Sequence, residues 1–561
     1  MVPYLSDSAT TTSDGFSSFI HLTPVQVVCL SGAFDNDCLK AETENQYCNN
    51  FLTVVLTTYR FLSSVVLPLF THLVPTICKA NVKINISSTV SFESSCQYLC
   101  YSRGDNSGMA PQQRKHVLVM ALPAFGHYIP GLELAKKIIP HHDVTMVMSI
   151  HKLQDIVQRD LLPPSPIQFH TFDDGFTFNI DENMGDLRGF SVANLQSEPY
   201  YETFINSLTV SNAASKRAGK LPPVDAIFCD ITMPMPFEPS VQRQIPIYGF
   251  MPQSAQMFAA YSVMNKDTRT VPDDVFFSGT DASFNQGDTI PESFKNMQDR
   301  YDRAQSVATG ILLNSFDELE PDALVSLKSL PKYANKPVCF VGPLLPTVND
   351  QSNDLSNKLR SWLDRREERS VVYFSFGTVA VPSSVQLTQV AEALLSLQRP
   401  FVWSLRSNQQ SLLPEKFLRG TVETLTDDMP YLILHWTPQK QILTHPATAV
   451  FVSHCGWNST LEAVAYGVPV VAWPMLGDQH HNAGLVEKWG IGKMMPAAGM
   501  KSEITPAADI AGVIETVGGW TSERPGSAYW EKVNELSQKA KNAVAVDGQS
   551  TRNLLQILNS F

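Results

Sequence analysis

The sequence predicts an α/β fold made of two Rossmann-like domains, each a doubly wound parallel sheet, that face each other across a cleft. The chain has 561 residues, whereas a single compact domain usually has about 100 to 200. From His116 onward, apolar runs of strand length alternate with segments whose apolar residues recur at helical spacing. A stretch rich in proline and polar residues, Cys339–Ser356, interrupts this alternation before it resumes. These three observations favour two sheets in series.

The first series predicts an N-terminal domain over residues 113–345. Its opening strand is HVLVMALP (His116–Pro123), and the turn AFGH then leads into IPGLELAKKII, whose apolar residues have helical spacing. Together these segments form a βα unit. Further strands of this series are expected at Val144–Ile150, Ala226–Asp230 and Ile245–Met251.

The second series predicts a C-terminal domain over residues 358–561, joined to the first by a linker at 346–357. We expect its last helix to pack back on the N-terminal domain. Its strands are expected at Ser370–Thr378, Pro400–Arg406, Tyr431–Trp436, Ala449–His454 and Pro469–Pro474. Ligands of open parallel sheets bind beyond the carboxyl ends of the strands, so the cleft between the domains is the expected site. Neither domain carries G-x-G-x-x-G after its first strand, nor the Walker motif, which disfavours dinucleotide redox chemistry and P-loop phosphoryl transfer.

Residues 1–112 are expected to be an extension outside the catalytic fold. They are rich in Ser, Thr and Cys and lack sustained helical or strand periodicity. The uncharged stretch Phe61–Cys78 is about long enough to span a bilayer, but Pro68 and Pro75 interrupt it. Membrane association is therefore expected only through this extension.

Charge and cysteine content narrow the class of protein further. The formal net charge of −12 disfavours nucleic acid as a partner, because a polyanion would be repelled on average. Only Cys229, Cys339 and Cys455 follow residue 100, too few and too scattered for a disulfide framework. We expect a cytoplasmic, monomeric protein.

The segment Trp436–Gln479 carries the densest set of candidate binding residues. After the apolar run AVFVS, polar residues and Gly456 lead into a helix start, where unpaired N–H groups can hold an anion such as a diphosphate. Glu462 follows Asn458 by one helical turn, where a carboxylate could hold a ribose diol. Trp436 offers a flat stacking face, and Asp478 and Gln479 follow the next strand. The combination predicts a nucleotide-sugar site.

This ordered combination resembles the signature box of the family 1 UDP-dependent glycosyltransferases, in particular the plant-type subgroup. The resemblance spans about residues 115–555 and includes HVLVMALPAFGHYIPGLELAKKI, ILLNSFDELEPDAL, VGPLLP and SWLDRREERSVVYFSFGT. Phe125 departs from the pattern, since many plant members carry Gln there. The resemblance implies a GT-B fold and an inverting displacement, in which an acceptor hydroxyl attacks the anomeric carbon as UDP leaves.

His127 matches the base of that family. A neutral imidazole with a pKa of about 6.5 can take a proton from a hydroxyl, and a carboxylate can orient the ring and stabilise the imidazolium. Asp230 is the candidate partner, because it ends the expected strand AIFCD as His127 follows the end of the first strand.

The resemblance also assigns donor contacts position by position. Trp436 would stack on uracil, Gln439 would contact the ribose or base, and Glu462 would hold the ribose hydroxyls. The residues implied at the diphosphate are His454, Asn458 and Ser459, with Ser375 and Thr378 also reaching the phosphates. The residues implied at the sugar are Trp457, Asp478 and Gln479.

The expected reaction is therefore transfer of a hexose, glucose from UDP-glucose, to a hydroxyl of a small lipophilic acceptor such as a phenol, terpenoid or steroid in secondary metabolism. UDP-sugar is the co-substrate, with no bound cofactor and no metal, since helix N-termini and donors can neutralise the leaving diphosphate. Another UDP-sugar, or a catalytically silent nucleotide-sugar-binding protein, are the alternatives. Near the base, the apolar run Met233–Phe237 with Met251, Met257 and Phe258 would be either an acceptor wall or core packing.

Overall fold

The computed structural model describes residues 114–150, 153, 156–157, 166–175, 187–210, 221–263, 292–347, 354–377, 382–414, 417, 429–475, 477–496, 504–520 and 525–561. The expected extension, including Phe61–Cys78, lies outside the described residues, and so does Thr378. The chain divides into Met1–Pro111 and Gln112–Phe561, and the second unit holds both sheets.

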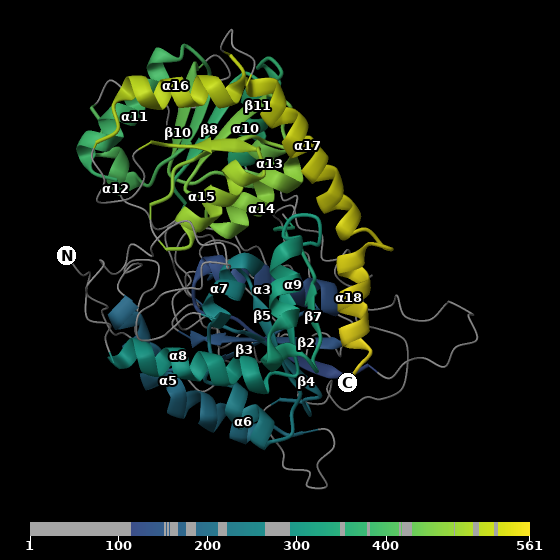
Figure 1. Ribbon diagram of the computed structural model, residues 1–561. Coiled ribbons are helices and arrows are strands. Elements are labelled where there is room, and N and C mark those ends of the chain that lie inside the picture. Colours follow the sequence, from purple (N-terminus) through teal and green to yellow (C-terminus); the bar gives the residue numbers. More distant parts are fainter. Residues whose placement is uncertain are drawn as a thin grey trace, which may run out of the picture. The chain divides into compact units, whose positions relative to one another are not determined.

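The first sheet has seven parallel strands in the order β3-β2-β1-β4-β5-β6-β7 (Figure 1). Its strands are β1 (His116–Met120), β2 (Asp143–Ser149), β3 (Gln168–Phe172), β4 (Ala226–Asp230), β5 (Ile247–Met251), β6 (Gly310–Leu313) and β7 (Val338–Phe340). The strand order reverses between β1 and β4, which places the residues after these two strands side by side.

The helices of this half connect the strands and cover the sheet. They are α3 (Phe125–Ile138), α5 (Leu187–Ser207), α6 (Phe237–Gln242), α7 (Ala255–Val263), α8 (Glu292–Val307), α9 (Pro321–Ser329) and the short 3₁₀ helix η3 (Pro331–Tyr333). β1, β4, β5 and β6 are buried along their whole length, as near-continuous apolar runs require in a sheet covered on both faces.

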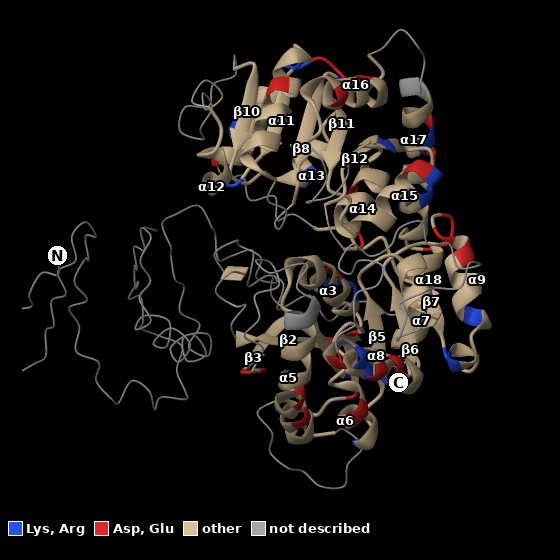
Figure 2. Ribbon diagram, turned by 60° about the vertical axis from the view of Figure 1, so that its left-hand side comes forward, with Lys and Arg blue, Asp and Glu red and all other residues tan. Residues whose placement is uncertain are grey.

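The second sheet has six parallel strands in the order β10-β9-β8-β11-β12-β13. Its strands are β8 (Val371–Ser375), β9 (Phe401–Ser404), β10 (Tyr431–Leu434), β11 (Thr448–Ser453), β12 (Val470–Ala472) and β13 (Gly492–Met494). Figure 2 shows Lys, Arg, Asp and Glu on helices and loops, whereas β8, β11 and β12 carry none of these residues. The order reverses between β8 and β11.

The helices of the second half run from the connection between the sheets to the end of the chain. They are α10 (Asp354–Asp364), α11 (Ser384–Ser396), α12 (Ser407–Gln410), α13 (Gln439–Leu443), α14 (Trp457–Tyr466), α15 (Gln479–Lys488), α16 (Ala507–Gly518), α17 (Pro525–Ala543) and α18 (Gln549–Leu558).

One segment of each half packs in the hydrophobic core of the other half. Phe316 and Leu319, which follow β6, are buried in the hydrophobic cluster of the second half. Conversely, α18 packs against β7, and its Leu554 and Ile557 join a cluster of the first half. His142 bonds through Nε2 to the carbonyl of Leu558 at 3.0 Å, which fixes the end of α18.

The predicted α/β fold with two parallel sheets is confirmed, while several element boundaries differ from expectation. α3 begins at Phe125, so His127 lies in its first turn rather than in a turn before the helix. β7 includes the first residues of Cys339–Ser356, the stretch expected to interrupt the strand–helix alternation. α10 begins at Asp354, inside the expected linker. β3, β6, β7 and β13 were not expected as strands. Among the described residues, no helix is both long and apolar enough to cross a membrane.

Candidate active site

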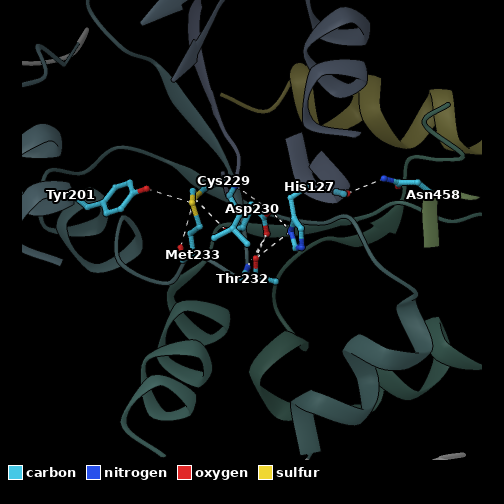
Figure 3. A network of polar contacts seen from close by, with 9 residues as sticks. His127, Tyr201, Cys229, Asp230, Thr232, Met233 and Asn458 are labelled. Atoms are coloured by element: carbon cyan, nitrogen blue, oxygen red, sulfur yellow. Dashed lines mark hydrogen bonds and ion pairs between the residues drawn. The ribbon is translucent and has the colours of Figure 1, made fainter. Parts of the chain in front are cut away.

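The structure brings His127 and Asp230 into direct contact (Figure 3). His127 Nδ1 lies 2.7 Å from Asp230 Oδ2, where the ring comes from the first turn of α3 and the carboxylate ends β4. The Asp230 side chain is 1% exposed and that of His127 is 16% exposed. The contact follows from topology, because β1 and β4 are neighbours at the point where the strand order reverses.

Asp230 is held by further donors on both carboxylate oxygens. Thr232 donates to Oδ1 from its hydroxyl at 2.7 Å and from its backbone N–H at 3.0 Å, and the Leu122 N–H approaches Oδ2 at 3.4 Å. With these bonds the carboxylate can turn little, and its acceptor oxygen fixes the proton of His127 on Nδ1. Nε2 is then the basic ring nitrogen.

The surroundings of the pair are apolar. Cys229 lies beside Asp230 in the chain, and burial raises the pKa of its thiol well above the usual value. Tyr201 lies with its hydroxyl 3.6 Å from Met233 Sδ (Figure 3). The same hydroxyl lies 3.4 Å from Asp174 Oδ2. The candidate acceptor-wall residues are all buried, and the members placed in the hydrophobic core around the first sheet are Met233, Met235, Phe237, Met251 and Phe258.

On the second sheet, Gln439 links Ser459 and Glu462, both on α14. Gln439 Nε2 donates to Ser459 Oγ at 3.1 Å and to a carboxylate oxygen of Glu462. Tyr373 on β8 donates its hydroxyl to Gln439 Oε1 at 3.1 Å and also contacts the Thr437 hydroxyl at 2.9 Å. Burial raises the pKa of Glu462 to about 7, which the Gln439 hydrogen bond and nearby Lys440 only partly oppose.

Four of the expected diphosphate residues lie around the start of α14, namely His454, Asn458, Ser459 and Ser375. The cap of this helix is Gly456, which has no side chain to satisfy the first N–H groups. His454 precedes it, and burial lowers the pKa of the imidazole to about 4, so the ring is neutral at pH 7. A Cβ at Gly377 would come within 2.6 Å of the His454 ring, so Ser375-Phe376-Gly377 at the end of β8 lies against His454.

Asn458, the second residue of α14, has a partner in the other half of the molecule. Its Nδ2 donates to the carbonyl of Gly126 at 2.9 Å, the residue directly before His127 (Figure 3). The buried Oδ1 of Asn458 has no hydrogen-bond partner among the described residues.

The remaining expected residues differ in exposure. Trp436 is 46% exposed after β10, as a stacking surface requires, whereas Trp457 is 3% exposed and donates its indole N–H to Asn314 O at 2.8 Å. Asp478 accepts from Asn482 Nδ2 at 3.0 Å, and Gln479 Oε1 accepts from the Met475 N–H at 2.9 Å. The indole of Trp457 thus packs between the halves rather than lying open at the site.

Sequence reasoning missed the side chains that orient these groups. Thr232 stands two residues after Asp230, a spacing at which a hydroxyl can bond back to a carboxylate, so a local signal existed. Asn482 stands one helical turn after Asp478, which is also a local spacing. Tyr373 gave no signal, because its partner Gln439 comes from another element of the fold. Among the residues that the structure describes, no three His, Cys, Asp or Glu side chains group as a metal site would need.

Comparison with known proteins agrees with this arrangement. Residues 328–517 match the model of the family UDP-glucoronosyl and UDP-glucosyl transferase. UDP-glycosyltransferase 72B1 of Arabidopsis thaliana is 28% identical over 479 residues, which are 80% of this chain and 96% of that protein. An anthocyanidin 3-O-galactosyltransferase of Rhododendron delavayi is 37% identical over 273 residues, but these are 48% of this chain and only 56% of that protein.

The fold is also shared with a solved structure. A UDP-glucosyltransferase from Polygonum tinctorium capable of glucosylating indoxyl, in complex with 3,4-dichloroaniline, superposes with a TM-score of 0.63 at 26% identity. The match covers 80% of this chain and 99% of that one. The two parallel-sheet domains of this chain have the GT-B arrangement of that UDP-glucosyltransferase. The chain belongs to the family 1 UDP-dependent glycosyltransferases, and it is a hexosyltransferase that acts on small molecules.

Proposed function

We propose that this enzyme is an inverting glucosyltransferase that moves glucose from UDP-glucose to a hydroxyl of a small lipophilic acceptor. In this proposal residues 113–345 bind the acceptor and residues 358–561 bind the UDP-sugar. The observation that carries the proposal is the 2.7 Å contact between His127 Nδ1 and the buried Asp230 carboxylate. A base oriented in this way is what activation of a hydroxyl requires.

The reaction follows from the tautomer that Asp230 imposes. Nε2 of His127 takes the proton of the acceptor hydroxyl as the oxygen attacks the anomeric carbon. The bond from that carbon to the UDP oxygen breaks on the opposite face, so the configuration inverts and UDP carries away the electron pair. The imidazolium that forms is stabilised by the Asp230 carboxylate, and the reaction ends when the proton passes to solvent.

The donor is held by the second half. Trp436 supplies a face for uracil, Glu462 with Gln439 holds the ribose hydroxyls, and the start of α14 receives the diphosphate. The residues that border this diphosphate site are His454, Asn458, Ser459 and Ser375, and Thr378 is proposed with them from the sequence alone. Backbone N–H groups and the helix dipole neutralise the leaving group, so no metal is required.

Glucose is the proposed sugar because Asp478 and Gln479 stand together at the start of α15. The bond from the Met475 N–H to Gln479 Oε1 orients the amide, and the bond from Asn482 holds the Asp478 carboxylate. Groups fixed in this way discriminate between an equatorial and an axial hydroxyl. Trp457 is proposed at the sugar through its backbone, since its indole is engaged by Asn314.

Aromatic hydroxyl compounds are the proposed acceptors, because the relatives named above act on anthocyanidins and indoxyl. Phenols, terpenoid alcohols and steroids form the test panel. We place the reaction in the cytoplasm, since Cys229, Cys339 and Cys455 are free and a glycan on the sequon Asn458-Ser459-Thr460 would block the diphosphate seat.

The test is to incubate the full chain with UDP-glucose, UDP-galactose or UDP-glucuronate and the acceptor panel, and to identify products by mass spectrometry. Turnover with UDP-glucose should exceed that with UDP-galactose by about ten-fold or more, and NMR should show the β-glucoside. EDTA should change the rate little. Equal turnover of the sugars, or faster turnover of UDP-glucuronate, would overturn the glucose assignment. Binding of UDP-glucose without any product would favour a silent nucleotide-sugar-binding protein.

A further inference from the structure

Asn482 on α15 is fully buried, and its NH₂ group faces two acceptors at the proposed donor site. Nδ2 lies 2.9 Å from the carbonyl oxygen of Cys455 and 3.0 Å from Asp478 Oδ2. Since both neighbours are acceptors, the carboxamide can take only this orientation. Its Oδ1 is also buried and has no hydrogen-bond partner among the described residues. The side chain therefore acts as a donor of two hydrogen bonds.

The first acceptor belongs to the turn between β11 and α14. Cys455 has a φ of 62°, in the left-handed region that residues other than glycine rarely adopt. The turn leads from His454 to Gly456, the cap of α14, where the diphosphate is proposed to bind. Because the peptide bond is planar, a hydrogen bond to the Cys455 carbonyl fixes the whole peptide that leads into α14. Asn482 thus holds a strained turn from the neighbouring helix, since α14 and α15 pack together (Figure 1).

The second acceptor is a proposed ligand of the sugar. Asp478 is the cap of α15 and lies one helical turn before Asn482, so the bond joins positions i and i+4. The Asp478 side chain is partly buried, and a hydrogen bond from a neutral amide orients its carboxylate without adding charge. A carboxylate that selects an equatorial hydroxyl must keep one orientation.

We propose that Asn482 is a positioning residue for the donor, which joins the turn at the start of α14 and the Asp478 carboxylate into one unit. The phosphate end and the sugar end of the UDP-sugar are then bound at a fixed spacing. The inference rests on the proposed function, because it requires that Asp478 bind the sugar and that the start of α14 bind the diphosphate. It goes beyond that function, since the NH₂ group of Asn482 bonds to the protein and acts on the donor only through these two acceptors.

A positioning role predicts two separate effects of Asn482→Leu, which keeps a similar volume without a hydrogen-bond donor. Loss of the bond to Cys455 should weaken UDP binding by about two- to ten-fold in calorimetry, as expected for one hydrogen bond. Loss of the bond to Asp478 should lower the preference for UDP-glucose over UDP-galactose by about three-fold or more. Both sugars compete for one phenol in the same reaction, so the measured preference does not depend on how much of the variant is folded.

Val486→Ala is the matched control, because Val486 is buried on the same helix and packs in the core of the second half. It should lower Tm and leave UDP affinity and sugar preference unchanged. An Asp478→Ala background separates the two bonds: the sugar preference is already lost there, so adding Asn482→Leu should not lower it further but should still weaken UDP binding. Asn482→Ser, whose shorter side chain cannot reach both acceptors, should reproduce both effects if the leucine variant does not fold.

The outcomes distinguish this inference from the proposed function. If Asn482→Leu is folded by thermal melting and keeps the UDP Kd and the sugar preference of the wild type, the positioning role is wrong. It is also wrong if Val486→Ala changes both quantities as much, because they then report stability alone. If the wild-type enzyme uses both sugars equally, or Asp478→Ala keeps the preference, the proposed glucose assignment fails instead. The UDP affinity of Asn482→Leu then still decides whether the bond to Cys455 positions the donor.

Discussion

The two sheets reverse their strand order at equivalent places, between β1 and β4 in the first and between β8 and β11 in the second, yet the polar groups there are satisfied differently. In the first half, both oxygens of Asp230 accept hydrogen bonds from the protein. In the second half, the described residues provide no partner for His454 Nδ1 or Asn458 Oδ1. Burial also shifts the pKa of Glu462 up to about 7 and that of His454 down to about 4.

This difference matches the separate roles proposed for the two halves, activation of the acceptor in the first and binding of the donor in the second. A base must have its position and tautomer fixed before the acceptor arrives, so its hydrogen bonds lie within the protein. A ligand-binding site gains affinity from polar groups that have no hydrogen-bond partner within the protein, because the ligand can then bond to them. Burying such groups without a partner lowers the stability of the free protein. Four substitutions would break or sharpen this contrast.

The largest effect is expected at the base. His127→Ala should lower transfer by about 10² to 10⁴-fold while the Kd of UDP stays within about two-fold, because the donor half is untouched. Steady-state rates and calorimetry on the same preparation check this. Full activity of the variant with a weakly acidic acceptor would mean that another group is the base.

The next effect concerns Glu462. Because burial holds its pKa at about 7, the carboxyl is ionised above that pH and accepts ribose hydroxyls best there. The Kd of UDP should therefore fall as pH rises from about 6 to 8, and Glu462→Gln should remove this part of the pH dependence while weakening UDP binding by about ten-fold.

The same substitution should stabilise the free enzyme. A carboxyl whose pKa is raised by folding contributes a stability that is full below the unfolded pKa and is lost as pH rises through the folded value. Above about pH 7, Glu462→Gln should then raise Tm by a few degrees, about 2 to 5 °C. A lower Tm for Glu462→Gln under these conditions would contradict the view that the buried carboxylate is costly.

Trp436 should show a comparable effect on UDP binding, without any cost to the fold. Trp436→Ala should weaken UDP binding by about ten-fold through loss of base stacking, and Tm should not change because the side chain is 46% exposed. Trp436→Phe should keep much of the affinity. An unchanged Kd in the alanine variant would show that uracil binds elsewhere.

Thr232→Val should have the smallest effect. It removes the hydroxyl donor to Asp230 Oδ1 and keeps the backbone donor, so kcat should fall by about three- to ten-fold with no change in UDP affinity. Thr232→Ser is the matched control and should retain the rate. Equal losses in both variants would point to packing of the methyl group instead.

Buried strands of five or more residues and the polar residues at their ends could be predicted from the sequence. Strands of three residues and contacts between distant elements could not. The bounds of β4 follow from the run AIFCD, because its apolar residues end at the charged Asp230. This end of the strand places Asp230 next to His127. β7 and β13 have three residues each, too few for a periodic pattern, and β7 was taken into the interruption between domains. The bonds of Tyr373 to Gln439 and of Asn458 to Gly126 join elements far apart in the chain, so no local pattern contains them.

The exchange of segments between the two cores limits how this enzyme can be recombined with its relatives. Phe316 and Leu319 precede the connection between the sheets but belong to the second core, while Leu554 and Ile557 end the chain but belong to the first. A chimera cut within the linker would therefore separate both segments from the side chains they pack against. A hybrid with a new acceptor half should keep residues 314–319 matched to the resident donor half and take residues 549–561 from the same parent as the acceptor half.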